Sequence, residues 1–202
     1  MATMSILAVD PGLSNYGYAV YNEYGEITKV GVLRTKKTKI KITRVSDDYA
    51  NRIASLTSQL NQTIKDNNIG AVIGEIPILG GQNASAVRDM AVSVAISMAV
   101  ITMLNLPVEW CTPMMVKVGL TGNKQASKKD MMMAAAKKYS WDITTKTITS
   151  KATGAMQRID NIYWPLGIKM GGNKFEHIAD AIGAAHALKD GNIIKMYCNK
   201  RR

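Results

Sequence analysis

Short apolar runs and one long amphipathic segment dominate the first half of the chain. The runs end at Gly, Pro, Asn or Asp, which is typical of strands closed by turns. Strands are predicted over 6–9, 16–21, 27–33, 71–76 and 108–111. From Val45 to Ile64 apolar residues recur every three or four positions, which is the period of a helix, and Ser46 and Asp47 suit its cap. The pattern therefore predicts a three-stranded meander, a helix, and two further strands.

The second half of the chain is expected to be mainly helical. Helices are predicted over 84–104, 113–118, 127–139 and 176–188. The segment 140–173 is rich in Thr, Lys and Gly and is expected to be a loop or a hairpin, anchored by residues such as Ile162 and Trp164. This order of elements predicts an α/β fold with a five-stranded mixed sheet, in which three antiparallel strands join parallel strands and helices cover both faces.

The predicted helix over 84–104 is apolar around its whole circumference. Its stretch 90–104 carries no charge, but it is shorter than the roughly 20 apolar residues that a membrane span requires. We therefore expect a helix buried on more than one face, with a second copy of the chain as one candidate for the additional cover, and no membrane association.

Charge and cysteine content narrow the class of protein. The 202 residues include 26 Lys and Arg against 15 Asp and Glu, a formal net charge of +11 that favours polyanionic partners, nucleic acid first. Only Cys111 and Cys198 are present, so no disulfide framework is expected, and the first residues show no export signal. We expect one domain over 1–202, with a basic tail over 195–202, in the cytoplasm of a bacterium or an infected host cell.

Three acids have positions that predict a metal centre. Asp10 ends the first predicted strand, Glu75 ends the fourth, and Asp180 lies in the first turns of the helix over 176–188. If the first and fourth strands are neighbours, a helix packed across their ends brings the three carboxylates together. Oxygen ligands of this kind bind Mg²⁺ and leave positions for water and phosphate, which predicts phosphodiester hydrolysis. The alternative for Asp10 is ordinary turn chemistry, whereas Glu75 interrupts a strand that should be buried.

Two polar residues near Asp180 have less specific patterns. His177 lies three positions before Asp180, on the same helix face, and is either a ligand, a proton carrier, or an ordinary cap. Glu176 precedes His177 and points about a quarter-turn of the helix away from it, and its simplest interpretation is an acid that interacts with the helix dipole.

Basic residues form two runs that we expect to contact nucleic-acid phosphates, with a solvated charged surface as the alternative. The first run is Arg34, Lys36, Lys37, Lys39, Lys41 and Arg44, and the second is Lys117, Lys124, Lys128, Lys129, Lys137 and Lys138.

Several motifs resemble those of the RuvC family of Holliday junction resolvases, which have the ribonuclease H-like fold. They are 6–12 with Asp10, then Gly17, Glu75, and 177–181 with His177 and Asp180, and they span nearly the whole chain. The segment after Pro113 resembles the family's lysine-bearing region, in which Lys117 and Lys128 are the matching positions.

The resemblance implies a homodimer that nicks two opposed strands of a four-way junction and leaves 5′-phosphate and 3′-hydroxyl ends. It implies that Asp10, Glu75, His177 and Asp180 hold two Mg²⁺ ions, or Mn²⁺ in their place. It further implies that Lys128 balances phosphate charge and that Lys117 holds the DNA backbone.

The chain departs from the bacterial pattern in two places. Where bacterial relatives carry an aromatic residue after the second acid, this chain has Ile78 and Leu79, which we expect to contact the junction. The segment 140–173 is longer than its equivalent, which predicts an insertion and suggests a phage or viral relative with a broader choice of branched DNA, flaps included.

Other functions remain open. A nuclease directed at RNA or at RNA–DNA hybrids would use the same acids. A non-catalytic binder of branched DNA would keep the fold and the basic surface, although the full set of acids argues against it. An actin-like ATP-binding protein needs a longer chain and a second phosphate loop.

Overall fold

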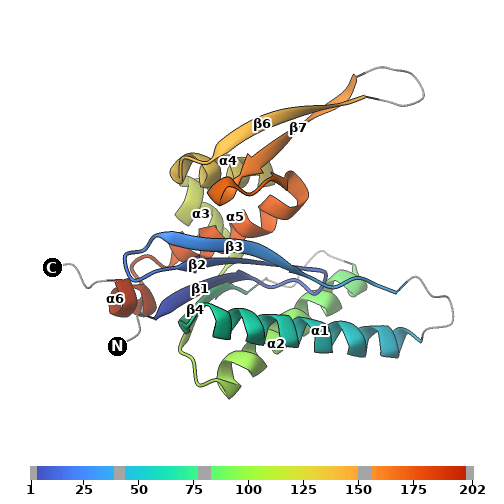
Figure 1. Cartoon of the computed structure of the whole chain (residues 1–202), viewed down its shortest axis with the longest axis vertical. Coiled ribbons are helices and arrows are strands. Elements are labelled where there is room, and N and C mark those ends of the chain that lie inside the picture. The colour runs from blue at the N-terminus through green and yellow to red at the C-terminus, as the bar shows by residue number, and fades with distance from the viewer. Residues whose placement is uncertain (1–3, 39–43, 77–82, 150–155, 199–202) are drawn as a thin grey trace.

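The structure is a computed structural model that describes residues 4–38, 44–76, 83–149 and 156–198 (Figure 1). The strands are β1 (Ser5–Asp10), β2 (Asn15–Tyr21), β3 (Ile27–Arg34), β4 (Ile69–Glu75), β5 (Val108–Cys111), β6 (Asp142–Thr149), β7 (Met156–Trp164) and β8 (Met170–Gly171). The helices are α1 (Val45–Asp66), α2 (Ala84–Met103), α3 (Pro113–Thr121), α4 (Lys128–Lys138), the short 3₁₀ turn η1 (Pro165–Gly167), α5 (Gly172–Ala187) and α6 (Asn192–Cys198).

The main sheet has five strands in the order β3-β2-β1-β4-β5. β2 pairs antiparallel with both β1 and β3, whereas β4 pairs parallel with both β1 and β5. The predicted mixed sheet, with its antiparallel meander and its parallel strands, is therefore confirmed. Because β1 and β4 are parallel neighbours, the residues that end them lie at the same edge of the sheet.

Helices cover the two faces of this sheet with two separate buried clusters (Figure 1). On one face α5 packs against β1 and β2, and α3 and α4 pack against α5. The middle of α5 consists of small residues, and a Cβ atom on Gly183 would lie 2.6 Å from Val116 of α3. Small side chains thus allow α5 to approach both the sheet and α3 closely.

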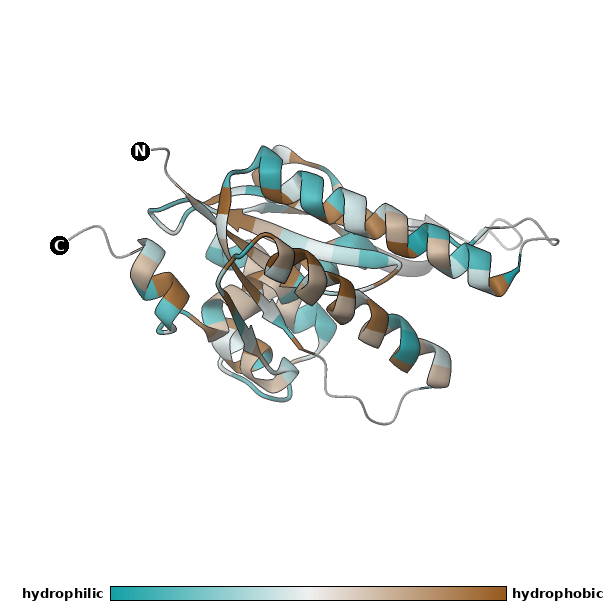
Figure 2. Ribbon diagram, turned by 90° about the horizontal axis from the view of Figure 1, so that it is seen from below, coloured by the Kyte–Doolittle hydropathy of each residue, from teal (hydrophilic) through white to brown (hydrophobic). Residues whose placement is uncertain are grey.

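On the other face, α1 and α2 pack against each other and the sheet. α1 buries Leu56, Leu60 and Ile64, as its helical period predicts. α2 buries only one side, and hydrophobic residues remain along its outer surface in Figure 2. The helix thus packs against α1 and the sheet, and cover of its outer side by a second copy of the chain stays a prediction.

By length and composition, α2 is the helix in the described ranges that is long and apolar enough to cross a membrane. The helix begins before the uncharged stretch 90–104, and its 20 residues therefore include two charged ones, Arg88 and Asp89. Its packing against α1 and the sheet favours the prediction of a helix buried within the fold, although it is buried along one side only.

Helix starts differ in how they are capped. The expected cap of α1 is wrong: its N-cap is Arg44, without a side-chain hydrogen bond, and the Ser46 hydroxyl bonds Asp47. In contrast, Ser127 and Asp130 form a reciprocal capping box at the start of α4.

The segment 140–173 forms a long hairpin, one of the two predicted alternatives, within a second sheet ordered β6-β7-β8. We call β6 and β7 the arm, because they extend away from the main sheet in Figure 1. The arm is anchored where the ring of Tyr163 stacks on Phe175 of α5, with 4.3 Å between ring centroids. The second sheet itself was not predicted.

One predicted helix start is wrong near the C-terminus, and one short helix there was not predicted. α5 begins at Gly172 rather than at 176, so Asp180 lies in its middle and not in its first turns. A further helix, α6, includes Lys195, so the predicted basic tail begins within a helix.

Candidate active site

Two acids lie side by side at one edge of the main sheet. Asp10 is the last residue of β1 and Glu75 is the last residue of β4. The chain turns sharply after Asp10, where a Cβ atom on Gly12 would lie 2.3 Å from the Asn15 carbonyl oxygen. The turn therefore needs glycine, and it leaves the Asp10 side chain about 18 % exposed.

Helix α5 brings His177 directly onto Asp10. A Cβ atom on Gly17 of β2 would lie 2.2 Å from the His177 carbonyl oxygen, so only glycine permits this approach of α5 to the sheet. The Nδ1 atom of His177 lies 2.8 Å from Oδ2 of Asp10. The sequence motif that includes Gly17 thus has a physical reason, since it sets the distance between the sheet and α5.

Glu176 and Lys128 extend this contact into a chain of charged groups. The Glu176 Oε1 atom lies 3.7 Å from His177 Nε2 and 3.2 Å from Lys128 Nζ. The predicted place of Glu176 at the start of the helix is therefore wrong, and its carboxylate lies beside two candidate site residues. The earlier start of α5 explains the error, because it moves Glu176 into the second turn.

Burial and mutual repulsion raise the pKa of two carboxyl groups. The pKa of Glu75 rises to about 8, because of its burial and then because of the charges of Asp10 and Asp180, with Lys117 acting in the opposite direction. Burial also raises the pKa of Asp180, and the charge of Asp10 adds to the rise. Asp10, Glu75 and Asp180 therefore lie within electrostatic reach of one another.

The pKa of His177 responds to opposing causes. Burial alone would lower it, but the hydrogen bond and the negative charge of Asp10 outweigh burial, and the net shift is upward. The imidazole is thus held against Asp10 with its Nδ1–H group donating a hydrogen bond to the carboxylate.

The donor set suits a hard divalent cation in its chemistry. In the described ranges, no three His, Cys, Asp or Glu side chains are close enough to hold a metal ion as they stand. Nevertheless, three acids with oxygen donors and one imidazole act on one another, and the pKa values of Glu75 and Asp180 are raised by burial and then by repulsion, both of which a bound cation would offset. The residues therefore fit the group that the resemblance implies.

Sequence reasoning missed two uncharged neighbours of the acids. Cys111 of β5 pairs in register with Glu75 and is buried, with its Sγ atom 3.4 Å from the Gly74 carbonyl oxygen. Tyr16 is buried within the electrostatic reach of Asp10, and its hydroxyl lies 2.8 Å from Ser97 Oγ of α2. In the sequence, only their positions near the ends of predicted strands could have indicated that they lie beside the acids.

Part of the first basic run lies at the same end of the sheet as the acids. Two antiparallel pairings connect β1 to β3, so the end of β3 at Arg34 lies at the edge where β1 ends. Arg34 and Lys36 line a depression of about 210 Å³, and Lys37 is exposed beside it. Lys39, Lys41, Ile78 and Leu79 lie outside the described residues.

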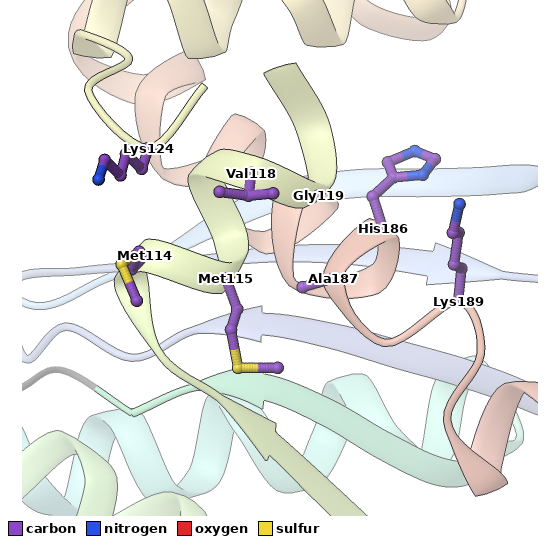
Figure 3. A pocket seen from close by; sticks show the side chains of 8 residues that line it. All are labelled: Met114, Met115, Val118, Gly119, Lys124, His186, Ala187 and Lys189. Carbon is purple, nitrogen blue, oxygen red and sulfur yellow. The ribbon is translucent and has the colours of Figure 1, made fainter. Parts of the chain in front are cut away.

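The second basic run is divided between two places. Lys117 and Lys128 act on the acidic cluster through their charges, whereas Lys129 is exposed on α4. Lys124 instead lines a cavity of about 430 Å³ between α3 and the end of α5, opposite Lys189 and above Met114 and Met115 (Figure 3). The structure thus joins only Lys117 and Lys128 to the candidate site.

The sheet, its covering helices and the acids at one shared edge define a protein of the ribonuclease H-like class. The chain belongs to the family described as crossover junction endodeoxyribonuclease RuvC, whose model matches residues 6–158.

Individual relatives agree with this family. RuvC of Salinibacter ruber is 29% identical over 131 residues, which cover 63% of this chain and 68% of the relative. RuvC of Aliarcobacter butzleri is 28% identical over 128 residues, which cover 63% of this chain and 79% of the relative. The structure of Thermus thermophilus RuvC in complex with a Holliday junction substrate superimposes with a TM-score of 0.61 at 16% identity, covering 91% of this chain and 92% of that one, which shows the shared fold.

Proposed function

We propose that the protein is a divalent-metal-dependent endonuclease that cuts four-way junctions and other branched DNA. The observation that carries this proposal is the contact between Asp10 and His177, which joins the end of β1 to α5 within one cluster that includes Glu75 and Asp180. Membership of the RuvC family supports junction DNA as the substrate.

Asp10, Glu75, His177 and Asp180 are the residues that would hold the metal, two Mg²⁺ ions or Mn²⁺ in their place. When bound, such ions would activate water and stabilise the leaving oxygen of a phosphodiester, and the products would carry 5′-phosphate and 3′-hydroxyl ends. The protein's own contribution is the orientation of His177 by Asp10 and the rigid spacing between α5 and the sheet at Gly17.

Lys128 is suited to bind the phosphate group that is cut. Its side chain is 75% exposed, and its ion pair with Glu176 is of the exposed kind that contributes little to stability. A phosphate can therefore replace Glu176 as its partner at small cost. The positive charge of Lys117 acts on Glu75, and at this position Lys117 can hold the DNA backbone.

The exposed cations at the end of β3 extend the proposed DNA path. Arg34, Lys36 and Lys37 continue the edge that carries the acids, and phosphate contacts by such residues position a duplex without reading its sequence. Binding should weaken steeply as salt is added, and a shallow dependence would argue against this path.

A second copy of the chain is the proposed cover for α2. Ala91, Ala95 and Met98 are exposed at spacings of four and three, so they form an apolar stripe on the outer side of the helix. A twofold pairing of this stripe would give a homodimer with two active sites, as a symmetrical cut of two strands requires.

The test is cleavage of a labelled mobile four-way junction, a flap, an RNA–DNA hybrid and a linear duplex in Mg²⁺, by the wild type and by Asp10→Asn. Paired nicks in the junction that the substitution abolishes are expected. Equal cutting of all branched forms would widen the substrate class, preferential cutting of the hybrid would favour the RNA-directed alternative, and cutting that needs no metal would contradict the proposal.

A further inference from the structure

The loop between the arm and α5 presents apolar side chains to solvent. Leu166 is 43% exposed and Ile168 is 48% exposed, although both are large aliphatic residues. They lie between Trp164, which ends β7, and Lys169, which precedes β8. We call Trp164, Leu166, Ile168 and Lys169 the loop patch.

The loop patch is rigidly built. Pro165 is buried, and its carbonyl oxygen accepts a hydrogen bond of 2.9 Å from the Ile168 amide. The indole Nε1 of Trp164 donates to Thr144 Oγ1 at 3.0 Å, which fixes the ring against β6. The exposure of Leu166 and Ile168 is therefore a property of an ordered turn.

Leu166 adopts a backbone conformation that a leucine seldom adopts. Its φ of 51° and ψ of 33° place it in the left-handed region, where glycine or asparagine would be less strained. Strain of this kind, at a residue whose side chain contributes little to the core, points to a use for that side chain outside the fold.

Positive charge around the patch indicates what it binds. The Lys169 ammonium lies 5.8 Å from the centre of the Trp164 ring, and Lys174 is exposed at the start of α5. Among the residues that the structure describes, neither lysine forms an ion pair with an acid. A partner that is anionic and also offers flat apolar surfaces matches this combination, and DNA with unpaired bases has both properties.

The position of the patch relates it to the active site. The loop leads within a few residues into α5, which carries His177 and Asp180, and η1 packs against β3, the strand that ends at Arg34 (Figure 1). Because His177 of α5 contacts Asp10, a DNA strand that reaches the acids across β3 on the α5 side of the sheet would pass close to Leu166 and Ile168.

We infer that the loop patch is a second DNA-binding site, in which Leu166 and Ile168 pack against unpaired bases at a branch point while Lys169 holds an adjacent phosphate. The inference rests on the proposed function in that branched DNA is the ligand. In this proposal the loop patch makes the protein prefer distorted DNA to fully paired DNA, and the acids, not the loop patch, carry out the cutting.

The experiment compares the wild type with the double variant Leu166→Gly/Ile168→Ser, without divalent metal so that DNA is not cut. The probes are a four-way junction with 2-aminopurine at the branch point, a linear duplex and a thymidine oligonucleotide. We expect the variant to bind the junction and the oligonucleotide at least about fivefold more weakly, and to lose the rise in 2-aminopurine fluorescence. Its affinity for the duplex should stay within about twofold of the wild type.

Met196→Ser is the matched control. Met196 is 72% exposed on α6, which packs against β4 and β5 at the opposite edge of the sheet from β3. This variant should bind all three probes as the wild type does. The melting temperature of Leu166→Gly alone should be unchanged or higher, because glycine adopts the left-handed conformation without strain.

Three results would overturn the inference: a double variant that keeps its affinity for the oligonucleotide, one that loses duplex affinity to the same extent, or one whose main change is in oligomeric state. The last would assign the patch to contact between two copies of the chain. By contrast, a wild type that binds junction and duplex equally would contradict the proposed function, and the oligonucleotide result would still decide the role of the patch.

Discussion

The two faces of the main sheet differ in the partners of their buried charged side chains. On the α1 and α2 face, Arg52 is 2% exposed, and it donates to Thr35 Oγ1 at 3.0 Å and to Ser14 Oγ at 2.8 Å. Asp89 lies 4.0 Å from the same guanidinium group. Two nitrogens of this guanidinium group thus link α1 to neighbouring segments, whereas its buried Nη1 atom has no hydrogen-bond partner among the described residues.

On the α5 face, three acids instead lie within electrostatic reach of one another. Burial and the neighbouring carboxylates raise the pKa of Glu75 to about 8, and His177 is the only group in contact with Asp10 among the described ion pairs. The comparison teaches that a buried charge alone does not indicate a functional site. The informative feature is a group of like charges that the fold brings together without neutralising them.

The largest effect should follow removal of an acid from the α5 cluster. Asp180→Asn should lower the rate of junction cleavage by about a thousandfold or more, because one donor for the metal is lost. Binding of the junction should persist, as measured by fluorescence anisotropy.

Asp190→Asn is the control for that change, since Asp190 is exposed beyond the other end of α5. It should cleave like the wild type. A comparable loss in both variants would mean that negative charge in general, and not the cluster, determines the rate.

The next effect tests the spacing between α5 and the sheet. Gly17→Ala should lower the cleavage rate by about a hundredfold and destabilise the fold by about 1 to 3 kcal/mol, because the new methyl group would collide with the His177 carbonyl oxygen. Thermal unfolding and single-turnover cleavage measure the two effects.

Gly171→Ala provides the matched comparison, because a Cβ atom there has no neighbour within 4 Å and its φ is −75°. Its cleavage rate should be that of the wild type. If Gly17→Ala also cleaves normally, the close approach of α5 is not what positions His177.

The α2 face should respond in assembly and not in chemistry. Met98→Glu would place a charge in the proposed dimer contact, and we expect the dimer to dissociate at least about tenfold more readily. Light scattering over a range of micromolar concentrations measures this. Met133→Glu on α4 is the control, because Met133 is 39% exposed and Met98 is 37% exposed. A dimer that survives Met98→Glu, or a wild type that is a monomer, would remove α2 from the interface.

The smallest effect concerns His186, a base on the α5 face that lies apart from the acids. Burial lowers its pKa to about 4, and the charges of Lys138 and Lys189 contribute, while its Nε2 atom lies 3.0 Å from the Tyr139 hydroxyl. The unfolded chain therefore binds a proton at higher pH than the folded chain, and stability that is present above pH 6.5 is lost as the pH falls towards 4.

We expect this loss to be about 1 to 2 kcal/mol after allowance for solvent screening, measured as the free energy of unfolding in urea at several pH values. His186→Gln should flatten that part of the profile, since glutamine can still bond Tyr139. An identical profile in the variant would show that other groups cause the acid sensitivity.

Much of the fold and of the candidate site could be predicted because the responsible signals are local. Apolar runs mark β1 to β5, and Asp10 and Glu75 are conspicuous because each ends an apolar run. The start of α5 could not be found in this way, because Gly172, Asn173 and Lys174 give no apolar period, and the error hid the role of Glu176. The left-handed Leu166 and the buried Arg52 were also beyond prediction, since tertiary contacts and not local preference determine both.

The most direct test of the central claim is incision of a supercoiled plasmid that extrudes a cruciform. A dimer with two active sites should cut both opposed strands within the lifetime of one complex and convert the plasmid to a linear form, in Mg²⁺ but not in EDTA, with ends that ligase can rejoin. A product that is only the nicked circle would contradict paired action by two copies. An unchanged plasmid, with a cruciform shown to be present, would contradict the proposal that this chain cuts junction DNA.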